Sequence, residues 1–443
     1  MKDLHVIVGL GVSGFSSAQY LKERGIPIAV IDSRANPPQL AAFQKLYPDV
    51  PVSVGQLDSP LLDKAECIIL SPGIALREPA IEKQIKRGIP VIGDIELFAR
   101  AVEVPVIAIT GTNAKSTVTT LVGKMADAAG FEAQTGGNLG IPALDLLKNS
   151  AAKVFVLELS SFQLETTHSL KPRVATVLNI SPDHMDRYDT VDDYQQAKYR
   201  IYQNCQIAVC NRDDPLTECN DQGLKKKLHF TLNTPADGEF GLLTRNNITY
   251  LAHGENPLLA VHELPVMGKH YQANALAALA IGHGFGLSFS PMLNVLREFT
   301  GLPHRCQLVR ELDNVKWYND SKGTNVGATE AAIRGLGSEI TGKLVMIMGG
   351  VGKNADFTPL APALQKYSRH VVLIGDASNE IATVLEKKVP CTYATSMDDA
   401  ISKAKALAKP DDSVLLSPAC ASFDMFTNYE HRGEVFTESV KKL

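Results

Sequence analysis

The chain has 443 residues, of which 45% are hydrophobic and 21% are charged, and its formal net charge is −4. This length predicts about three domains at roughly 150 residues each, and the composition is that of an ordinary globular protein. The negative net charge argues against a nucleic-acid-binding platform, which usually presents a basic surface. The sequence has no run of about 18 apolar residues, so we expect no insertion into a membrane.

The seven cysteines are scattered along the chain. No two of them have the close Cys-x-x-Cys spacing of a zinc site, and their odd number and scatter favour a reducing compartment. The first apolar run is interrupted by glycines and is too short for a signal peptide. We therefore expect a cytoplasmic protein, and we expect it to be a monomer.

Strands alternate with helices in three successive segments, residues 1–93, 94–300 and 301–443. Such alternation predicts parallel sheets covered by helices on both faces, which is the α/β class. We expect three α/β domains over these segments. In open parallel sheets ligands bind beyond the carboxyl ends of the strands, so polar residues after apolar runs are the candidates for chemistry.

In the first segment, a strand over residues 4–8 is followed by a glycine-rich turn and a helix. Gly9, Gly11 and Gly14 match the dinucleotide-binding fingerprint, and Asp32 ends the next strand. This pattern predicts a diphosphate at the helix start and a ribose near the acid. A nicotinamide or flavin cofactor and a uridine diphosphate satisfy it equally. A glycine turn that serves packing alone is the remaining alternative.

The second segment contains a short phosphate-binding loop. An apolar strand over residues 106–109 leads into a small-residue turn that ends in Lys115, Ser116 and Thr117, and a helix follows. Backbone N–H groups at a helix start favour anions, the lysine reaches the outer phosphates, and a hydroxyl binds Mg²⁺. Ile109 replaces the first glycine of the full Walker spacing, so the match is to a shorter loop. An ordinary strand–turn–helix with a solvated lysine is the alternative.

Two further apolar runs end in groups that suit a metal site. Glu158 lies at the end of the run 154–159, and Asp183 and His184 follow the run 174–180. A carboxylate beside a phosphate loop is the usual partner of Mg²⁺. The histidine is typical of a second metal ligand or of a group that contacts the reacting atoms. A surface glutamate and a structural histidine are the alternatives.

Lys198 lies within the apolar stripe of a helix expected over residues 193–206. A lysine on the inner face of a helix loses solvation, which lowers its pKa and exposes a nucleophilic amine. Periodicity alone favours the alternative, in which the side chain extends until its ammonium group reaches water. The stripe consists of Tyr194, Ala197, Ile201, Tyr202 and Cys205.

Short alternating runs between residues 231 and 265 predict a small antiparallel insertion. In the third segment, strands are expected over residues 316–319, 343–348, 371–374 and 413–416.

Charged, turn-rich stretches accompany these last strands. Arg305, Lys322 and Lys353 suit carboxylates or phosphates, although each taken alone is more typical of a solvated charge. Cys420 has no histidine pattern associated with it, so we expect a small buried thiol. Trp317 is expected to pack in a core.

Taken together, these motifs resemble the Mur ligases, the ATP-dependent amide-forming enzymes of peptidoglycan assembly, over essentially the whole chain. The match is closest to the D-glutamate-adding member, and the Asp-Asn-Pro-Arg run of the diaminopimelate-adding member is missing. The markers are Ser71-Pro72-Gly73, residues 92–97, the phosphate loop, and residues 157–165, 183–188, 319–322 and 416–422.

The resemblance implies a Rossmann-like N-terminal domain, a central ATP-binding domain of the P-loop type and a Rossmann-like C-terminal domain. In chain order, these domains would hold a uridine nucleotide, ATP and the incoming amino acid. The implied substrates are UDP-N-acetylmuramoyl-L-alanine, D-glutamate and ATP, with two Mg²⁺ ions. A substrate carboxylate would attack the γ-phosphate, and the amine of D-glutamate would then attack the acyl phosphate. Since water destroys an acyl phosphate, the third domain should close over the site.

The resemblance also implies a role for individual residues. Lys115, His184 and Lys198 would be catalytic, and Lys198 would be carbamylated by CO₂. The uridine substrate would contact Val12, Ser13, Asp32, Ser33, Arg34, Gly73 and Asn138. ATP would contact Gly111, Thr112, Asn113, Ala114, Lys115, Ser116, Thr117, Asn274, Arg305 and Asp320. The metal ligands would be Ser116, Glu158, His184 and Lys198. D-Glutamate would contact Lys322, Thr324, Lys353, Ser422, Phe423 and Tyr429.

Three positions depart from the family pattern. Ala114 stands where glycine is usual, and since a β-carbon disfavours positive φ, we expect a negative φ there. Gly323 stands where alanine is commoner, and Val351 stands where an acid is commoner. The last two departures concern the amino-acid pocket rather than the type of reaction.

Three other functions stay open from the sequence. An NAD-dependent dehydrogenase accounts for the glycine fingerprint but leaves Lys115, Glu158 and Lys198 without a role. A folylpolyglutamate-synthase-like ligase shares the phosphate loop and the chemistry. A non-catalytic nucleotide-binding regulator would bind ATP without turnover.

Overall fold

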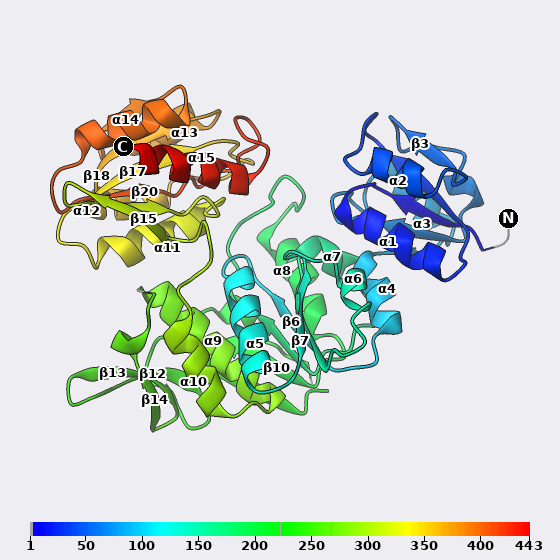
Figure 1. Cartoon of the computed structure of the whole chain (residues 1–443), viewed down its shortest axis with the longest axis horizontal. Coiled ribbons are helices and arrows are strands. Elements are labelled where there is room, and N and C mark those ends of the chain that lie inside the picture. Colours follow the sequence, from blue (N-terminus) through cyan, green and yellow to red (C-terminus); the bar gives the residue numbers. More distant parts are fainter. Residues whose placement is uncertain (1–2, 222, 267) are drawn as a thin grey trace.

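The computed structural model describes residues 3–221, 223–266 and 268–443. It contains three sheets, each covered by helices. Figure 1 shows the N-terminal domain in blue, the central domain in cyan to green and the C-terminal domain in yellow to red, with the first and last on two sides of the central one. Among the helices of these described residues, none combines the length and apolar character needed to cross a membrane.

The N-terminal domain has a five-stranded parallel sheet in the order β3-β2-β1-β4-β5. The turn after β1 brings the start of α1 close to the strand, and a β-carbon on Gly14 would overlap the carbonyl oxygen of Gly9. The elements are β1 (His5–Val8), α1 (Val12–Glu23), β2 (Ile28–Asp32), α2 (Leu40–Leu46), β3 (Val52–Val54), η1 (Leu62–Lys64), β4 (Cys67–Leu70), α3 (Pro79–Lys86) and β5 (Val91–Ile92).

The central domain has a nine-stranded sheet in the order β14-β13-β12-β11-β10-β9-β6-β8-β7. Its elements are α4 (Asp94–Ala101), β6 (Val106–Thr110), α5 (Lys115–Ala128), β7 (Ala133–Gly137), α6 (Ala143–Leu146), β8 (Val154–Glu158), α7 (Ser161–Glu165), β9 (Val174–Val177), α8 (Val191–Tyr199), η2 (Arg200–Tyr202), β10 (Ile207–Asn211), η3 (Pro215–Thr217), β11 (Lys226–Phe230), β12 (Phe240–Arg245), β13 (Ile248–His253), β14 (Asn256–Ala260), η4 (Val261–Glu263), α9 (Lys269–Phe285) and α10 (Phe289–Glu298). The predicted antiparallel insertion corresponds to β12–β14, which pair antiparallel and extend the main sheet rather than forming a separate one.

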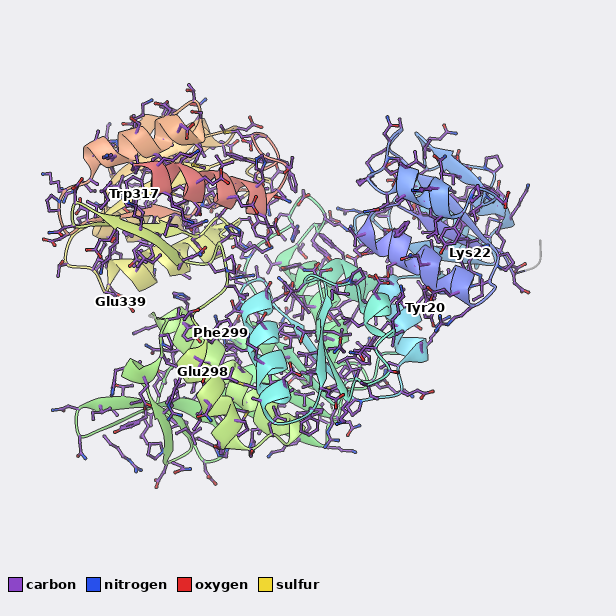
Figure 2. The ribbon with its side chains drawn as sticks, viewed as in Figure 1. Tyr20, Lys22, Glu298, Phe299, Trp317 and Glu339 are labelled. Atoms are coloured by element: carbon purple, nitrogen blue, oxygen red, sulfur yellow. The ribbon has the colours of Figure 1, made fainter. Side chains whose placement is uncertain are left out.

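The C-terminal domain has a six-stranded sheet in the order β15-β16-β20-β17-β18-β19, parallel except for the β15–β16 pair. Trp317 is 1% exposed and packs near Phe436 of the last helix, as expected for a core residue (Figure 2). The elements are β15 (Gln307–Leu312), β16 (Val315–Asn319), α11 (Val326–Gly337), β17 (Leu344–Gly349), α12 (Leu360–Tyr367), β18 (Ser368–Ile374), α13 (Ser378–Leu385), β19 (Cys391–Tyr393), α14 (Met397–Leu407), β20 (Ser413–Leu416) and α15 (Tyr429–Lys442).

The middle strands of the central sheet are buried on both faces, which explains their continuous apolar sequence. In β6, Ile107 and Ile109 pack into a core with α5 and α9, whereas Val106 and Ala108 face a second core on the other side. This arrangement fixes the carboxyl ends of β6, β8 and β9 side by side, since β6 pairs with both neighbours.

Two elements are shorter than the sequence pattern predicts. The strand expected over residues 174–180 ends at Val177, because the next backbone groups bind side chains and loops instead: the N–H of Ile180 donates to Asp214 at 2.7 Å. The helix expected over residues 193–206 is α8, which ends at Tyr199 and tightens into the 3₁₀ turn η2.

Candidate active site

The phosphate loop joins β6 to α5, which begins at Lys115. The segment just after the neighbouring strand β9 holds its backbone: the N–H of Thr112 donates to the Asn179 carbonyl at 2.9 Å, and that of Asn113 to the Asn179 side chain at 2.8 Å. Ala114 precedes the helix with a φ of +68°, so the expected negative φ is wrong. The turn into the helix needs the left-handed conformation that glycine adopts without strain, and here an alanine adopts it.

Two lysines donate to the same loop carbonyl. Nζ of Lys115 lies 2.9 Å from the carbonyl oxygens of Gly111 and Thr112, and Nζ of Lys198 lies 2.8 Å from that of Gly111. Lys198 is 1% exposed, and burial, together with the charge of Lys115, places its pKa well below the usual value. The inward-facing lysine with a depressed pKa is confirmed, and the alternative of an ammonium group in water is wrong.

Glu158 ends β8 opposite Ile109, the residue before the last one of β6. Its Oε1 accepts a hydrogen bond from the Asn138 side chain at 2.6 Å, whereas its buried Oε2 has no partner among the residues that the structure describes. A buried carboxylate oxygen is costly unless something binds it. This oxygen and the hydroxyl of Ser116 are hard donors of the kind that Mg²⁺ prefers, so the residues present fit a magnesium ion.

His184 lies on the loop after β9, and its ring packs edge-on against Phe162 with 4.8 Å between centroids. Burial lowers the pKa of His184 to about 4 in spite of the neighbouring Asp183 carboxylate. The imidazole is therefore neutral at pH 7, as a metal ligand must be. The ring of Tyr194 lies 6.4 Å from that of His184 and 4.5 Å from Nζ of Lys198. His184, from the loop after β9, and Lys198, from α8, therefore lie near the same tyrosine ring.

Polar contacts join the C-terminal domain to the central domain at this edge. Nζ of Lys353 lies 2.8 Å from Asp183, and the Asn325 side chain donates to the same carboxylate at 3.0 Å. The guanidinium of Arg305 donates to the Ser116 hydroxyl at 2.7 Å. Burial alone would raise the pKa of Asp183, but the charge of Lys353 lowers it overall. The charges of Arg305 and Lys353 thus belong to an interdomain contact, and the reading of each as a solvated group is wrong.

A cavity of about 370 Å³ lies between these two domains beside the phosphate loop. Asp320 contributes to its wall, and its carboxylate accepts hydrogen bonds from the Cys306 N–H at 3.1 Å and the Ser417 hydroxyl at 2.7 Å. Burial raises the pKa of Asp320 to about 6. The residues that the sequence assigned to ATP and that line this cavity are Asn113, Ala114, Thr117, Asn274, Arg305 and Asp320.

A second cavity, of about 620 Å³, begins at the carboxyl edge of the N-terminal sheet and reaches the central domain. The Asn138 side chain, which lines this cavity, also donates a hydrogen bond to the candidate metal ligand Glu158. All of the residues expected at the uridine substrate line it: Val12, Ser13, Asp32, Ser33, Arg34, Gly73 and Asn138.

The Asp32 carboxylate binds groups of the protein itself, whereas in the dinucleotide fingerprint this acid binds a ribose hydroxyl. Its carboxylate accepts hydrogen bonds from the Leu10 N–H at 2.7 Å and from the Arg34 guanidinium at 2.7 and 2.9 Å. Burial would raise the pKa of Asp32, but these contacts lower it overall. Both carboxylate oxygens are therefore engaged within the protein, and a ribose hydroxyl would have to compete with Arg34 for them.

The residues expected around D-glutamate fall into two groups. Thr324 and Lys353 line a third cavity, of about 330 Å³, together with Asp183 and His184. Lys322 instead lines the cavity beside the phosphate loop. Its Nζ lies 3.8 Å from the centre of the Tyr429 ring, and burial lowers its pKa to about 8.

Ser422 and Phe423 belong to the loop after β20, and they differ in exposure. Ser422 is 2% exposed, whereas Phe423 is 73% exposed.

Val351 stands where an acid is commoner in the family. Its backbone N–H donates to the Ala421 carbonyl, and its carbonyl accepts from the Ala421 N–H, so these two hydrogen bonds join the loop after β17 to the loop after β20. At Gly323, a β-carbon would lie 2.7 Å from both Asp320 Oδ2 and Ser417 Oγ, so this loop is built for glycine. Cys420 is fully buried, and burial raises its pKa to about 12, as expected for an inert thiol.

Sequence reasoning missed Arg187, which joins the N-terminal and central domains. Its guanidinium donates to the carbonyls of Pro72 and Ile74 at 2.8 and 3.2 Å and to Glu165 at 2.9 Å, and it lies 4.1 Å from the centre of the Phe162 ring. The only sequence signal was its place in the charged run after β9. Its partners are distant in the chain, so nothing local distinguishes it from a solvated arginine.

Three α/β domains, a phosphate loop and a buried carboxylate that suits Mg²⁺ fit an ATP-dependent ligase of acids and amines. Three family models match the chain: "Mur ligase MurD-like, N-terminal domain" over residues 3–93, "Mur ligase middle domain" over 109–282 and "Mur ligase, glutamate ligase domain" over 304–420. The chain belongs to the Mur ligase family.

Full-length relatives agree with this assignment. UDP-N-acetylmuramoylalanine–D-glutamate ligase of Nitrosococcus oceani is 52% identical, with 99% of this chain and 96% of that protein covered. The protein of the same name from Pseudomonas savastanoi is 53% identical, with 99% and 98% covered. Among solved structures, a pseudomurein peptide ligase type C from Methanothermus fervidus shares the fold, with a TM-score of 0.64 at 18% identity and 100% of both chains covered.

Proposed function

We propose that this protein adds D-glutamate to UDP-N-acetylmuramoyl-L-alanine with cleavage of ATP to ADP and phosphate. The observation that carries the proposal is the identity of about half of all residues, over nearly the whole length, to proteins that bear this activity in their name. The geometry supports it, because one cavity lies at the first sheet and another beside the phosphate loop, and Asn138 of the first cavity bonds to Glu158.

In this proposal each domain binds one substrate. Residues 1–93 bind the uridine nucleotide, residues 94–300 bind ATP, and residues 301–443 bind D-glutamate. Lys115 turns from the loop carbonyls to the γ-phosphate, while the N–H groups at the start of α5 hold the phosphate chain. Mg²⁺, held by Ser116 and Glu158, would supply charge that lets a carboxylate approach the γ-phosphate. A second ion would be held at His184 and Lys198.

The reaction itself then proceeds in two transfers. The alanine carboxylate forms a bond to the γ-phosphorus, and the bond to ADP breaks. The amine of D-glutamate next attacks the acyl carbon, loses a proton and expels phosphate. The interdomain contacts at Asp183 and Ser116 bring the third domain against the loop, which keeps water from the acyl phosphate. Such a reaction fits the cytoplasmic location expected from the scattered cysteines.

We further propose that Lys198 carries a carbamate. Its buried amine, with a pKa well below the usual value, is available in the neutral form that adds to CO₂. The addition forms an N–C bond and releases one proton, so that a neutral amine becomes an anion. A carboxylate-like group at this position would bind a cation and attract the positive charge of Lys115.

For the amino-acid site we propose Lys353 and Thr324 as direct contacts, because they share a cavity with His184. Lys322, Ser422, Phe423 and Tyr429 would complete the site as the loops close on the substrate. Lys353 would then exchange Asp183 for a carboxylate of D-glutamate.

Phosphate release with defined substrates tests the function. We expect release only when UDP-N-acetylmuramoyl-L-alanine, D-glutamate and ATP are all present, and much slower release with L-glutamate or L-alanine. Release that depends on a folate would favour the folylpolyglutamate-synthase-like alternative. Oxidation of NADH with a candidate substrate would favour the dehydrogenase, and ATP binding without any turnover would favour the regulator.

A further inference from the structure

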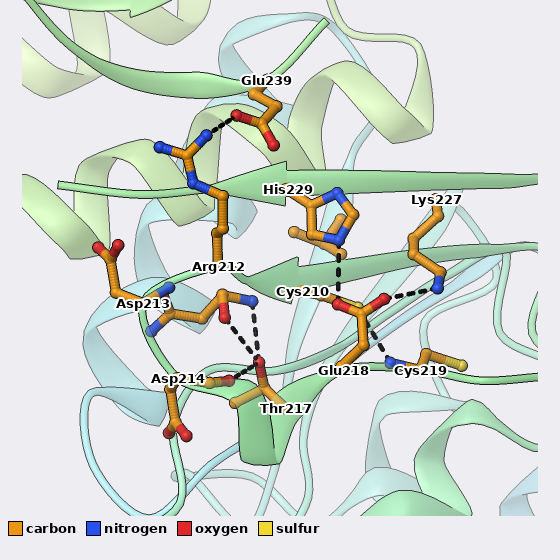
Figure 3. A network of polar contacts seen from close by, with 12 residues as sticks. Cys210, Arg212, Asp213, Asp214, Thr217, Glu218, Cys219, Lys227, His229 and Glu239 are labelled. Atoms are coloured by element: carbon orange, nitrogen blue, oxygen red, sulfur yellow. Dashed lines mark hydrogen bonds and ion pairs between the residues drawn. The ribbon is translucent and has the colours of Figure 1, made fainter. Parts of the chain in front are cut away.

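A cluster of metal-binding side chains lies in the central domain, apart from the residues assigned to the reaction. Cys210 belongs to β10, His229 to the adjacent strand β11, and Glu218 to the segment between them, just after η3. Cys210 and His229 are direct partners in the parallel register. Figure 3 shows the three side chains converging, while the sulfur of Cys219 points away from them.

The donor atoms of this cluster are already close together. Cys210 Sγ, a carboxylate oxygen of Glu218 and a ring nitrogen of His229 all lie within 4.8 Å of one another. Nε2 of His229 is 3.0 Å from Glu218 Oε2, and Lys227 occupies the other oxygen of Glu218, at 2.6 Å. Oε2 therefore faces the histidine and the thiol, and Lys227 holds the carboxylate in that orientation.

We propose that Cys210, Glu218 and His229 form a binding site for a divalent transition-metal ion of the Zn²⁺ type. Thiolate and imidazole are ligands that select such ions over Mg²⁺. A tetrahedral zinc ion holds sulfur, nitrogen and oxygen at about 2.0–2.3 Å, so the three donors need only small shifts. A water molecule would complete the four ligands, since the side chains of Glu218 and His229 are 35% and 27% exposed and leave access from solvent.

Binding of the metal ion changes where protons sit on two of its ligands, Cys210 and His229. Burial raises the pKa of Cys210 to about 11, so the free site holds a thiol that also contacts the Tyr202 hydroxyl and accepts from the Cys219 N–H at 3.4 Å. On binding, the S–H proton goes to solvent and a sulfur–metal bond forms. The proton on Nε2 of His229 moves to Nδ1 through solvent, so that Nε2 can bind the ion. No oxidant or reductant is required.

The site lies at the same sheet edge as the reaction. Tyr202, which contacts Cys210, also receives the N–H of Val177 at the end of β9 and donates to the Thr217 carbonyl. Asp214, in the same segment as Glu218, accepts the N–H of Ile180 at 2.7 Å. These contacts fix the strand end that leads to Asp183 and His184, so an ion at the cluster would stiffen that support.

Titration of the full-length, metal-free protein with Co²⁺ tests this proposal, with Mg²⁺ in excess to occupy oxygen-ligand sites. We expect about one equivalent of Co²⁺ to give the near-ultraviolet absorption of a cobalt–thiolate bond, and we expect Zn²⁺ to abolish it. Cys210→Ser should remove the band, and His229→Gln should weaken Co²⁺ binding at least about tenfold. The control Cys391→Ser, in the third domain, should leave the band unchanged.

Either of two absorption results would overturn the proposal: no thiolate band in the unmodified protein, or an undiminished band in Cys210→Ser. Because Cys210 is buried and its variant is at risk of misfolding, His229→Gln provides a second measurement at a partly exposed position. Zn²⁺ should raise the thermal midpoint of the unmodified protein and should not raise that of His229→Gln. An equal rise in both would also count against the site. None of these measurements depends on catalysis, so they stay informative if the proposed ligase activity fails.

Discussion

Lys353 of the C-terminal domain and Asp183 of the central domain form an ion pair of 2.8 Å, with side chains that are 18% and 9% exposed. The pair connects the loop that follows β17 with the loop that carries His184. Among the described residues, it is the contact between these two domains that joins two full charges in a largely buried setting, and such contacts are costly to break from one side.

Replacement of Lys353 by alanine should therefore impair the reaction strongly. It leaves the carboxylate of Asp183 without its cation and removes a proposed contact of D-glutamate. A loss of about 2–3 kcal/mol, as for a hydrogen bond between charged groups, corresponds to a fall of about 30–150-fold in kcat/KM for D-glutamate. Steady-state kinetics would measure this fall in kcat/KM. Lys388→Ala serves as the control, because Lys388 is exposed and lies just after the C-terminal end of α13. A rate within twofold of the unmodified protein would contradict the role of the pair.

Ala114→Gly should stabilise the protein. Ala114 has a φ of +68°, where a β-carbon costs about 1 kcal/mol or more, and this gain exceeds the cost of a more flexible unfolded chain. Thermal unfolding should show a midpoint higher by a few degrees. Ala129→Gly, at a φ of −89°, is the matched control and should lower the midpoint. Equal effects of the two substitutions would mean that the loop holds Ala114 without strain.

Lys198→Ala should lose most activity. The substitution removes both the donor to the Gly111 carbonyl and the amine that would take up CO₂. Added bicarbonate should not restore turnover, whereas a small carboxylic acid should restore part of it by taking the place of the carbamate. Lys171→Ala, at an exposed position, serves as the control. Full activity of Lys198→Ala would remove the lysine from the mechanism.

Arg187→Ala should raise the KM for the uridine substrate about tenfold or more, with little change in the KM for ATP. The arginine fixes the Pro72 and Ile74 carbonyls beside Gly73, which lines the cavity proposed for the uridine substrate. Arg77→Ala is a suitable control, because its ion pair with Asp189 joins side chains that are 52% and 82% exposed and should contribute little. If the two KM values rose together, Arg187 would act on overall folding rather than on the uridine site.

The sequence predicts those parts of the site that depend on short-range pattern. The strand–loop–helix around Lys115 and the placement of Glu158 at a strand end follow from apolar runs and from the geometry of parallel sheets. Glu158 taken alone is typical of a surface residue, and only its combination with the phosphate loop makes it a candidate metal ligand. The register of Ile109 with Glu158 explains this, because it places Glu158 beside the start of the loop.

Contacts between distant segments could not be predicted in this way. Lys353 and Asp183 are far apart in the chain, and neither local sequence signals that they form an ion pair. The left-handed φ of Ala114 was missed for a different reason. The intrinsic preference of alanine argues against this conformation, whereas the loop that adopts it is held by a distant segment through the Asn113–Asn179 hydrogen bond. Periodicity alone also favoured a solvated Lys198, since the pattern cannot show that the helix packs against the phosphate loop.

Isotope transfer is the most direct test of the claim that ATP activates a carboxylate. UDP-N-acetylmuramoyl-L-alanine with a heavy oxygen isotope in both carboxylate positions would be turned over with D-glutamate and ATP, and the released phosphate analysed by mass. Passage through an acyl phosphate predicts that each phosphate carries one heavy oxygen. Phosphate without the label, at a normal rate of amide formation, would contradict the mechanism.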